Sequence, residues 1–437
     1  MDQSPAKIAI IGLGTVGAGV ARILTENPDR IRRRSGRAVE IRHAVVRDLD
    51  RTRDISLPDG VLTDDIDAAI TDPDVDIVVQ LMGGTDVAKN KMIAALDAGR
   101  DVVTANKALL CEYGTELFQH ARSKGRTIAF EAAVAGGIPI IAAVGQSLAA
   151  NQITSIEAIL NGTSNYILTE MLARDRSYAD VLKEAQELGY AEADPAMDVD
   201  GTDAAQKLAI LVQLAFGTRV DLSSIQMQGI DRLQLADLRY ADELGYTVKL
   251  LAVARLVSDQ LEMHVQPTLI RSHRAIAQTG GALNIIALKG DVIGPAWFAG
   301  PGAGQMPTAS AVVADLIEMI SGRSAISFQR LDLWRDSPAY TLRPPEQTQN
   351  RFYLHFNIDD RPHVLADIAD ILGRNEISIA SVMQHEAPEV DDQAESERVP
   401  LVIMTHKTTE GRLRAADEEL SKSPHIETPY VRMPCAG

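Results

Sequence analysis

The chain contains 437 residues and carries 43 Lys and Arg against 60 Asp and Glu, a net charge of −17 at pH 7. This length corresponds to roughly three domains of about 150 residues, and the two cysteines exclude a disulfide framework and a thiolate zinc site. The negative charge disfavours nucleic acid as a partner, residues 1–10 lack the pattern of a secretory signal, and the uncharged window 132–156 has too short an apolar part to span a membrane. We therefore expect a cytoplasmic protein with no membrane partner.

Up to about residue 130, strand patterns alternate with helix patterns, which predicts an open parallel sheet. Strands are expected at residues 7–11, 39–46, 75–81, 101–104 and 127–130, and helices at 16–24, 89–98 and 117–123. Asn27-Pro28 is expected to close the first helix. The run 75–81 is almost continuously apolar, as is typical of a strand buried on both faces.

A G-x-G-x-x-G motif lies between the first strand and the first helix. Its first glycine permits a tight turn, the second lets the backbone approach a pyrophosphate, and the third lets helix and strand pack closely. The start of the helix then faces the phosphates. The motif predicts NADP or NAD as cofactor, with contacts from Gly12, Gly14, Thr15, Val16 and Gly17.

The end of the second strand holds the residues that would read the ribose. An acid there favours a free 2′-hydroxyl, and an arginine accommodates a 2′-phosphate. Because Arg47 and Asp48 stand side by side, the choice between NAD and NADP stays open. Residues 1–53 hold 11 basic and 6 acidic residues, a net charge of +5, which suits either a solvated face or an anionic cofactor.

After residue 150 the pattern becomes that of an α+β domain. Strands are expected at 153–160, 250–257, 261–267, 282–288 and 291–293, and helices at 161–173, 178–188 and 204–216. Gly300-Pro-Gly-Ala-Gly304 reads as a glycine-rich turn that leads into a long helix at 308–320.

The last part of the chain follows a linker with Pro344-Pro345. Strands are expected at 352–358, 377–384, 401–405 and 426–431, helices at 364–374 and 411–420, and an acidic loop at 386–397. This βαββαβ order is typical of a ferredoxin-like module.

Two lysines and a group of carboxylates carry the candidate chemistry. Lys107 follows the carboxyl end of a strand, where open α/β sheets bind ligands. Asp203 and Lys207 are four residues apart, so they share one helix face. A surface ion pair is the plain alternative. The acidic block 189–203 suits a substrate ammonium, and it lacks the regular alternation of a calcium-binding EF-hand.

Taken in order, these motifs make the chain recognisable over nearly its whole length. It resembles the homoserine dehydrogenase family, in the monofunctional form with a C-terminal ACT domain. The motifs that carry the resemblance are Gly12-Leu-Gly-Thr-Val-Gly17, Gly83-Gly84, Thr104-Ala-Asn-Lys107, Glu131-Ala-Ala-Val-Ala-Gly-Gly-Ile-Pro139, Asn161-Gly-Thr-Ser-Asn165, residues 189–207 and Gly300-Pro-Gly-Ala-Gly304.

The resemblance implies an α/β protein with three domains. A Rossmann-type nucleotide-binding domain spans residues 1–135 and is completed by about 300–335. An α+β catalytic and dimerisation domain spans 136–299, residues 336–350 form a linker, and a ferredoxin-like ACT domain spans 351–437. A homodimer or homotetramer is expected.

The implied reaction is the reversible NAD(P)-dependent reduction of L-aspartate 4-semialdehyde to L-homoserine, in the biosynthesis of threonine, methionine and isoleucine. The resemblance places Lys107 and Lys207 beside the reacting carbonyl for proton transfer, with Asp203 at the same end. The implied substrate contacts are Glu192, Asp198, Thr163 and Tyr190. The further implied cofactor contacts are Gly83, Thr104, Asn106, Lys107, Gly302 and Ala303.

The family also has a monovalent-cation loop. The resemblance implies that the Glu131 side chain and the carbonyls of Val134, Gly136 and Ile138 hold Na⁺ or K⁺, since oxygen-only ligation suits a hard cation. The alternative is a buried, glycine-rich strand end. Gln80 departs from the acid expected before Gly83-Gly84.

The ACT segment departs from its family at one position. Asp360-Arg-Pro-His363 stands where Asp-x-Pro-Gly is usual, and the glycine normally gives the turn conformational freedom. Feedback inhibition by threonine stays open. So do the alternatives, in which the ACT domain only assembles subunits or binds another ligand.

Two other functions remain. One is a related NAD(P)-dependent oxidoreductase that acts on another amino-acid carbonyl. The other is a non-catalytic amino-acid sensor, against which the pair Lys107 and Lys207 argues, because a sensor needs no proton-transfer groups.

Overall fold

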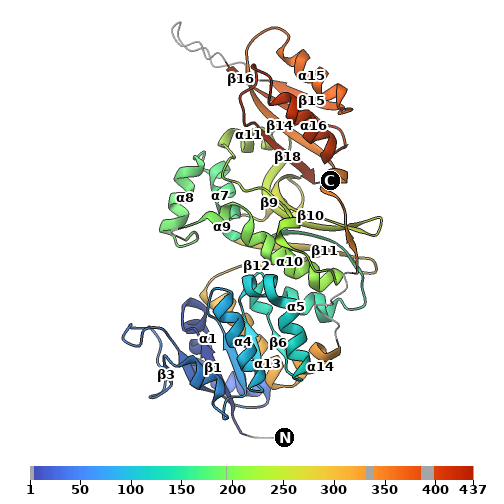
Figure 1. Ribbon diagram of the computed structural model, residues 1–437. Helices are drawn as coiled ribbons and strands as arrows, with labels where there is room; N and C mark the ends of the chain where they lie inside the picture. Colours follow the sequence, from blue (N-terminus) through green and yellow to red (C-terminus); the bar gives the residue numbers. More distant parts are fainter. Residues whose placement is uncertain (1–3, 193, 331–338, 385–397, 437) are drawn as a thin grey trace. The chain divides into compact units, whose positions relative to one another are not determined.

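The computed structural model describes residues 4–192, 194–330, 339–384 and 398–436 (Figure 1). The chain forms two compact units, each assembled from three segments. The first unit contains Met1–Ile156, Asp203–Ile225 and Leu283–Tyr340, and the second contains Glu157–Thr202, Gln226–Ala282 and Thr341–Gly437. These units cut the chain at other points than the three predicted domains do, so the boundaries given above stay predictions.

A six-stranded parallel sheet forms the centre of the first unit. Its strand order is β3-β2-β1-β4-β5-β6, and every pairing is parallel. The bounds are β1 (Ala6–Ile11), β2 (Val39–Val45), β3 (Leu62–Thr63), β4 (Ile77–Gln80), β5 (Asp101–Thr104) and β6 (Ile128–Ala129). All four residues of β4 are buried, as the apolar run predicted. The order reverses between β1 and β4, and open α/β sheets bind ligands at the carboxyl ends of such strands.

The helices of this unit pack on the sheet and on one another. They are α1 (Thr15–Glu26), α2 (Pro28–Ser35), α3 (Ile66–Thr71), α4 (Asp86–Asp97), α5 (Lys107–Ser123), α6 (Ile140–Ala142), α10 (Thr202–Phe216), α13 (Gln305–Ile320) and α14 (Arg323–Arg330). Asn27-Pro28 does end α1, and Pro28 is then the first residue of α2. Proline is tolerated there because the N–H group of a first helical residue has no acceptor within the helix, so its absence costs no hydrogen bond. A Cβ at Gly19 would lie 2.9 Å from that of Ala309, so α1 and α13 approach closely.

The antiparallel hairpin of β11 (Leu283–Gly290) and β12 (Gly294–Pro301) also belongs to the first unit. The expected strand at 291–293 is wrong, because these residues form the hairpin turn. The Asp291 side chain accepts the N–H of Gln152, and the Ile293 N–H donates to Asn151 Oδ1 at 2.8 Å. Gly294 then takes a left-handed backbone, φ 72°. β7 (Ile153–Ile159) crosses the boundary between the units in the sequence.

The second unit contains the predicted pair of long strands. β9 (Tyr246–Val257) and β10 (Gln260–Arg271) pair antiparallel, and the short strands β8 (Gln226–Met227) and β13 (Thr341–Leu342) join β10. Its helices are α7 (Gly162–Ala173), α8 (Tyr178–Glu187), α9 (Ala196–Val199), α11 (Leu235–Glu243) and α12 (Ala275–Gln278). Both α7 and α11 pack against β9.

The C-terminal part of the second unit has the predicted βαββαβ order. Its elements are β14 (Gln349–Asp359), α15 (Val364–Arg374), β15 (Ile379–Gln384), β16 (Arg398–Thr405), β17 (Thr408–Thr409), α16 (Glu410–Leu420) and β18 (Val431–Ala436). The antiparallel sheet runs β18-β14-β16-β15 over its own core, which includes Leu354, Phe356, Leu401 and Leu413. β18 also pairs with β10, so the sheet continues into the rest of the unit.

Two expectations in this part differ from the structure. The last strand lies at 431–436 and not at 426–431, because Ile426 makes one isolated bridge to Ile358 and turns its side chain into the core. The expected linker 336–350 contains β13 and a 3₁₀ turn at Pro345–Gln347. Residues 336–338 and the expected acidic loop at 386–397 lie outside the described residues. Among the residues that the structure describes, none of the helices has the length and apolar character to cross a membrane.

Candidate active site

The glycine motif forms a tight cradle at the carboxyl end of β1. Gly12 has φ 103°, and a Cβ on Gly17 would lie closer than 3.0 Å to the Gly12 carbonyl oxygen. Gly14 is the N-cap residue of α1, has no side chain to cap the helix, and has open space where its Cβ would be. The N–H groups at the start of α1, which includes Thr15 and Val16, are therefore available to an anion such as a pyrophosphate.

Arg47 and Asp48 lie just beyond the end of β2, and both are exposed. Asp48 Oδ1 accepts the backbone N–H groups of Asp50 and Arg51, at 3.0 and 3.2 Å, so this carboxylate is partly used in holding its own turn. Arg53 donates to the Asp48 carbonyl oxygen at 2.7 Å. The position predicted to read the ribose thus has both signs of charge.

Polar side chains join the ends of β4 and β5. The Thr104 hydroxyl is buried and donates to Gln80 Oε1 at 2.6 Å, and Gln80 Nε2 donates to the Met82 carbonyl oxygen at 2.9 Å. Asn106 Nδ2 donates to the Gly84 carbonyl oxygen at 2.7 Å. Gln80, which stands in place of the expected acid, thus acts as a neutral donor and acceptor towards Met82 and Thr104, while Asn106 holds the exposed Gly83-Gly84 turn.

Asn106 also begins α5. Its side chain accepts the N–H of Leu109 at 3.0 Å, a typical N-cap contact. The helix expected at 117–123 therefore starts ten residues earlier, and Lys107 is its first residue. The position of Lys107 after a strand was predicted correctly. The start of the helix at Lys107 was missed, although an asparagine at position 106 is a typical helix N-cap and was the available signal.

The start of α13 brings a second glycine turn to this unit. A Cβ on Gly302 would clash with the buried Asn284 side chain, and Gly304 has φ 115°. Ala303 between them is exposed. Only glycine fits at position 302, because its backbone is in direct contact with the side-chain amide of Asn284.

Lys107, Asp203 and Lys207 form one ionic cluster within the first unit. Lys107 Nζ lies 3.3 Å from Asp203 Oδ1, and Lys207 Nζ donates to Asp203 Oδ2 at 2.7 Å. The side chains of Asp203 and Lys207 are 10% and 12% exposed, while that of Lys107 is 33% exposed. The spacing of four residues predicted the Asp203–Lys207 contact; only the fold brings Lys107 to the same carboxylate.

The predicted substrate residues of the second unit gather around the start of α7. The buried Thr163 hydroxyl donates to the Tyr190 carbonyl oxygen at 2.6 Å. Asp198, on α9, accepts from Asn161 Nδ2 at 2.9 Å, and its carbonyl oxygen accepts the Ser164 hydroxyl at 2.5 Å. Thr163, Tyr190 and Asp198 are therefore held together, with Asn161 as the N-cap of α7.

Glu192 and the Tyr190 ring are more open. Glu192 is exposed and accepts from Gln186 through its backbone carbonyl, and Tyr190 is 47% exposed, with its ring 4.9 Å from that of Tyr166. Asn161 and Ser164, which tie the group together, were not among the predicted site residues. Their position in an Asn-Gly-Thr-Ser sequence before a helix was the available signal.

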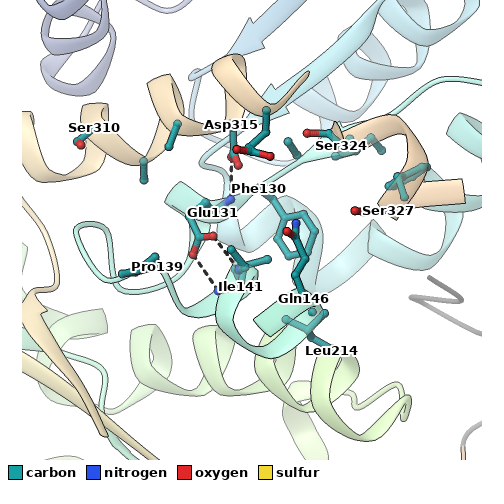
Figure 2. Close-up of a pocket in the computed structure, with 18 of the residues that line it drawn as sticks. Phe130, Glu131, Pro139, Ile141, Gln146, Leu214, Ser310, Asp315, Ser324 and Ser327 are labelled. Atoms are coloured by element: carbon teal, nitrogen blue, oxygen red, sulfur yellow. Dashed lines mark hydrogen bonds between the residues drawn. The ribbon is translucent and has the colours of Figure 1, made fainter. Parts of the chain in front are cut away.

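Glu131 lies in a pocket of about 440 Å³ in the first unit (Figure 2). Its carboxylate accepts the N–H groups of Ile141 and Ala142, both at 2.8 Å, and its own N–H donates to Asp315. Burial raises the pKa of both carboxyl groups, and their proximity adds to the rise at Asp315.

The rest of the predicted cation loop is close by in the chain. Val134 and Ile138 are buried, and the Ile138 carbonyl oxygen accepts the Ile140 N–H. Gly136 has φ 35°, and a Cβ on it would lie 2.9 Å from the Gly302 carbonyl oxygen. The donor set consists of oxygens, which fits a hard monovalent cation in chemistry. Within the described residues there is no group of three acidic, His or Cys side chains of the kind that holds a transition metal.

A doubly wound parallel sheet with a glycine cradle at β1, and lysines paired with an acid in the same unit, define an NAD(P)-dependent oxidoreductase. Three family models match the chain: the homoserine dehydrogenase NAD binding domain over residues 12–131, homoserine dehydrogenase over 139–317, and the ACT domain over 354–425.

Whole-chain comparisons agree. The chain is 42% identical to the homoserine dehydrogenase of Pseudomonas aeruginosa, covering 99% of both chains, and 42% identical to that of Neisseria gonorrhoeae, covering 98% of both. A solved homoserine dehydrogenase from Thiobacillus denitrificans matches with a TM-score of 0.90 at 41% identity, covering 100% of this chain and 99% of that chain. The chain belongs to the homoserine dehydrogenase family.

Proposed function

We propose that the protein catalyses the reversible NAD(P)-dependent reduction of L-aspartate 4-semialdehyde to L-homoserine, in the biosynthesis of threonine, methionine and isoleucine. The observation that carries this proposal is the Lys107–Asp203–Lys207 cluster in the unit that also has the glycine cradle. Bound at the cradle, the cofactor supplies or accepts the hydride. The residues of the chain bind the substrate and move the proton.

The lysine cluster manages the charge that hydride transfer creates. Reduction of the aldehyde leaves an alkoxide, which needs a proton, and a protonated lysine can supply one as a general acid. In the reverse direction a neutral lysine takes the hydroxyl proton. Counting these three groups alone, two ammonium ions and one carboxylate leave one net positive charge, which favours a developing alkoxide. Asp203 holds both lysines, so it keeps either of them in position.

The acids of the second unit recognise the amino-acid end of the substrate. A substrate with an α-ammonium group needs carboxylates, and Asp198 and Glu192 provide them. Asp198 is oriented by Asn161, whose side-chain amide donates to one of its carboxylate oxygens at 2.9 Å. Thr163 and Tyr190 are the neutral contacts of the same group.

A steady-state assay tests the function directly. We expect oxidation of L-homoserine with NADP⁺ or NAD⁺ at a kcat/KM at least a hundredfold above that for other amino alcohols of similar size, because a substrate must offer both an ammonium group to the acids and a hydroxyl group to the lysines. A preference for another amino alcohol would establish the related oxidoreductase instead. Absence of turnover with every one of them, together with cofactor binding, would favour a sensor.

The ACT module is proposed to regulate or assemble the enzyme. His363 takes the place of the usual glycine and adopts a left-handed backbone, φ 77°, as the N-cap of α15. The turn conformation is therefore kept while a side chain is added to it. Threonine feedback and assembly into a homodimer or homotetramer are the two proposed roles, and the same assay at saturating threonine, with light scattering for the subunit number, separates them.

A monovalent cation is proposed at the Glu131 loop, where it would be held by the Glu131 carboxylate and the carbonyls of Val134, Gly136 and Ile138. We expect K⁺ or Na⁺ to raise kcat several-fold when it replaces N-methyl-D-glucamine at constant ionic strength. The variant Glu131→Gln should lose this activation, because it removes the charge from the donor set. Glu318→Gln is the control: Glu318 lines the same pocket but pairs with Arg323. Equal activity of the wild type in all three cations would contradict the cation site.

A further inference from the structure

Lys249, on β9, is a buried lysine that the proposed mechanism does not use. It is 2% exposed, and its ammonium group contacts neutral oxygens. The Nζ atom donates to Asn165 Oδ1 and to the Thr279 carbonyl oxygen, both at 2.8 Å, with the Thr169 hydroxyl at 3.5 Å. Within the described part of the chain, the partners of this nitrogen are all neutral oxygens.

A buried ammonium without an anionic partner opposes folding, because it loses its hydration. Burial lowers the pKa of Lys249 to about 8. The group is therefore largely charged at neutral pH, and its contribution to stability improves only as the pH rises from the folded pKa near 8 towards 10.5, the ordinary value. An apolar side chain of equal length would be less costly here, so stability alone does not account for a lysine.

The ammonium joins two segments that are distant in the sequence. One is the first turn of α7, through Asn165. The other is the turn 279–282, through Thr279, whose carbonyl oxygen also accepts from Asn165 Nδ2 at 3.1 Å. At the far end of this contact a Cβ on Gly162 would lie 2.6 Å from the Ala282 carbonyl oxygen, so the two segments touch along their length.

The same turn of α7 carries the residues proposed to bind substrate. Thr163 holds the Tyr190 carbonyl, and Asn161 and Ser164 hold Asp198. A shift of this turn would move all of these groups together. It would not change the residues of the glycine cradle, because the cradle belongs to the first unit and α7 to the second.

We propose that Lys249 is a positioning residue for substrate recognition: its ammonium locks the first turn of α7 to the turn 279–282 and so sets the place of Thr163 and Asp198. The inference rests on the proposed function for the identity of the substrate. It assigns Lys249 to the binding of the amino-acid end and to neither hydride nor proton transfer.

The test is the variant Lys249→Met, which keeps the chain length and removes the charge and the donors. We expect the KM for homoserine to rise tenfold or more, with kcat less affected and the KM for the cofactor within twofold of wild type. The melting temperature at pH 7 should be equal to or above that of the wild type. Asn165→Leu should raise the same KM at least as much, because it removes the contact with Lys249 and also the bond from Asn165 Nδ2 to the Thr279 carbonyl oxygen. The double variant should be less impaired than the product of the two single effects, because the Lys249–Asn165 contact is counted in both.

Leu413→Ala is the matched control, since Leu413 is fully buried in the core of the C-terminal module of the same unit. It should lower the melting temperature and leave the KM for homoserine unchanged. An unchanged KM in Lys249→Met, or a rise in both KM values together with a lowered melting temperature, would overturn the proposal. If Lys249→Met does not fold, Asn165→Leu tests the same contact from the other side. A wild type inactive with homoserine would contradict the proposed function, whereas an active wild type with an unaffected Lys249→Met contradicts only this inference.

Discussion

The variant Lys207→Ala is expected to lose about 10²–10⁴-fold in kcat, the usual contribution of a positioned general acid or base. Lys207 is 12% exposed and donates to Asp203 at 2.7 Å, so its ammonium is held in one place. Removing it also leaves Asp203 with one lysine partner fewer. The dissociation constant for the dinucleotide, measured by fluorescence titration, should stay within threefold of wild type.

Lys183→Ala serves as the control for that loss. Lys183 is exposed on α8, and its removal should leave kcat and both KM values unchanged. Turnover by Lys207→Ala within tenfold of wild type would remove Lys207 from the catalytic assignment. An equal loss in Lys107→Ala would mean that the two lysines act as one unit around Asp203.

The variant Gly17→Ala should strongly damage the nucleotide half. Its Cβ would lie closer than 3.0 Å to the Gly12 carbonyl oxygen, which is a backbone atom and cannot rotate away. Helix α1 would have to move off β1, at a cost of about 3 kcal/mol. We expect a lower denaturant midpoint and at least a tenfold weaker affinity for the dinucleotide.

Gly14→Ala separates cofactor contact from folding. A Cβ there has no atom within 4 Å, and its φ of −78° suits any residue. This variant should therefore keep the denaturant midpoint of the wild type but bind the dinucleotide more weakly, because the backbone at Gly14 is where a pyrophosphate would approach. Unchanged affinity in Gly14→Ala would show that the cofactor does not approach this turn.

Local patterns predicted much of the secondary structure. The strand at 101–104 and the helix at 364–374 have the predicted bounds. The helix has a clear apolar period in Val364, Ile368 and Leu372, and the strand has two adjacent buried valines. Where the pattern was ambiguous, contacts made the decision. Ile426 was predicted to lie in a strand because it is apolar. Its side chain does pack into the core, but its segment forms only an isolated bridge with Ile358.

The candidate site divides in the same way. The Asp203–Lys207 contact and the Asn161 cap of α7 each join residues that are at most four positions apart. Spacing predicted the first, and it would also have been sufficient to predict the second. The contacts of Lys107 with Asp203 and of Lys249 with Asn165 join residues more than 80 positions apart. No local rule can find such pairs.

The amino-acid sequence by itself determined the class of the fold, the dinucleotide motif and the family, because glycine spacing and apolar periodicity act over a few residues. Only the tertiary structure decided that Asp203 contacts two lysines, that Gln80 bonds as a neutral group to Thr104 and Met82, and that Lys249 lies buried against the first turn of α7. The physical reason is that charge, burial and hydrogen bonding depend on neighbours in space. It is also the tertiary structure that groups the segments 203–225 and 283–330 with the nucleotide-binding sheet in one compact unit, despite their distance in the chain.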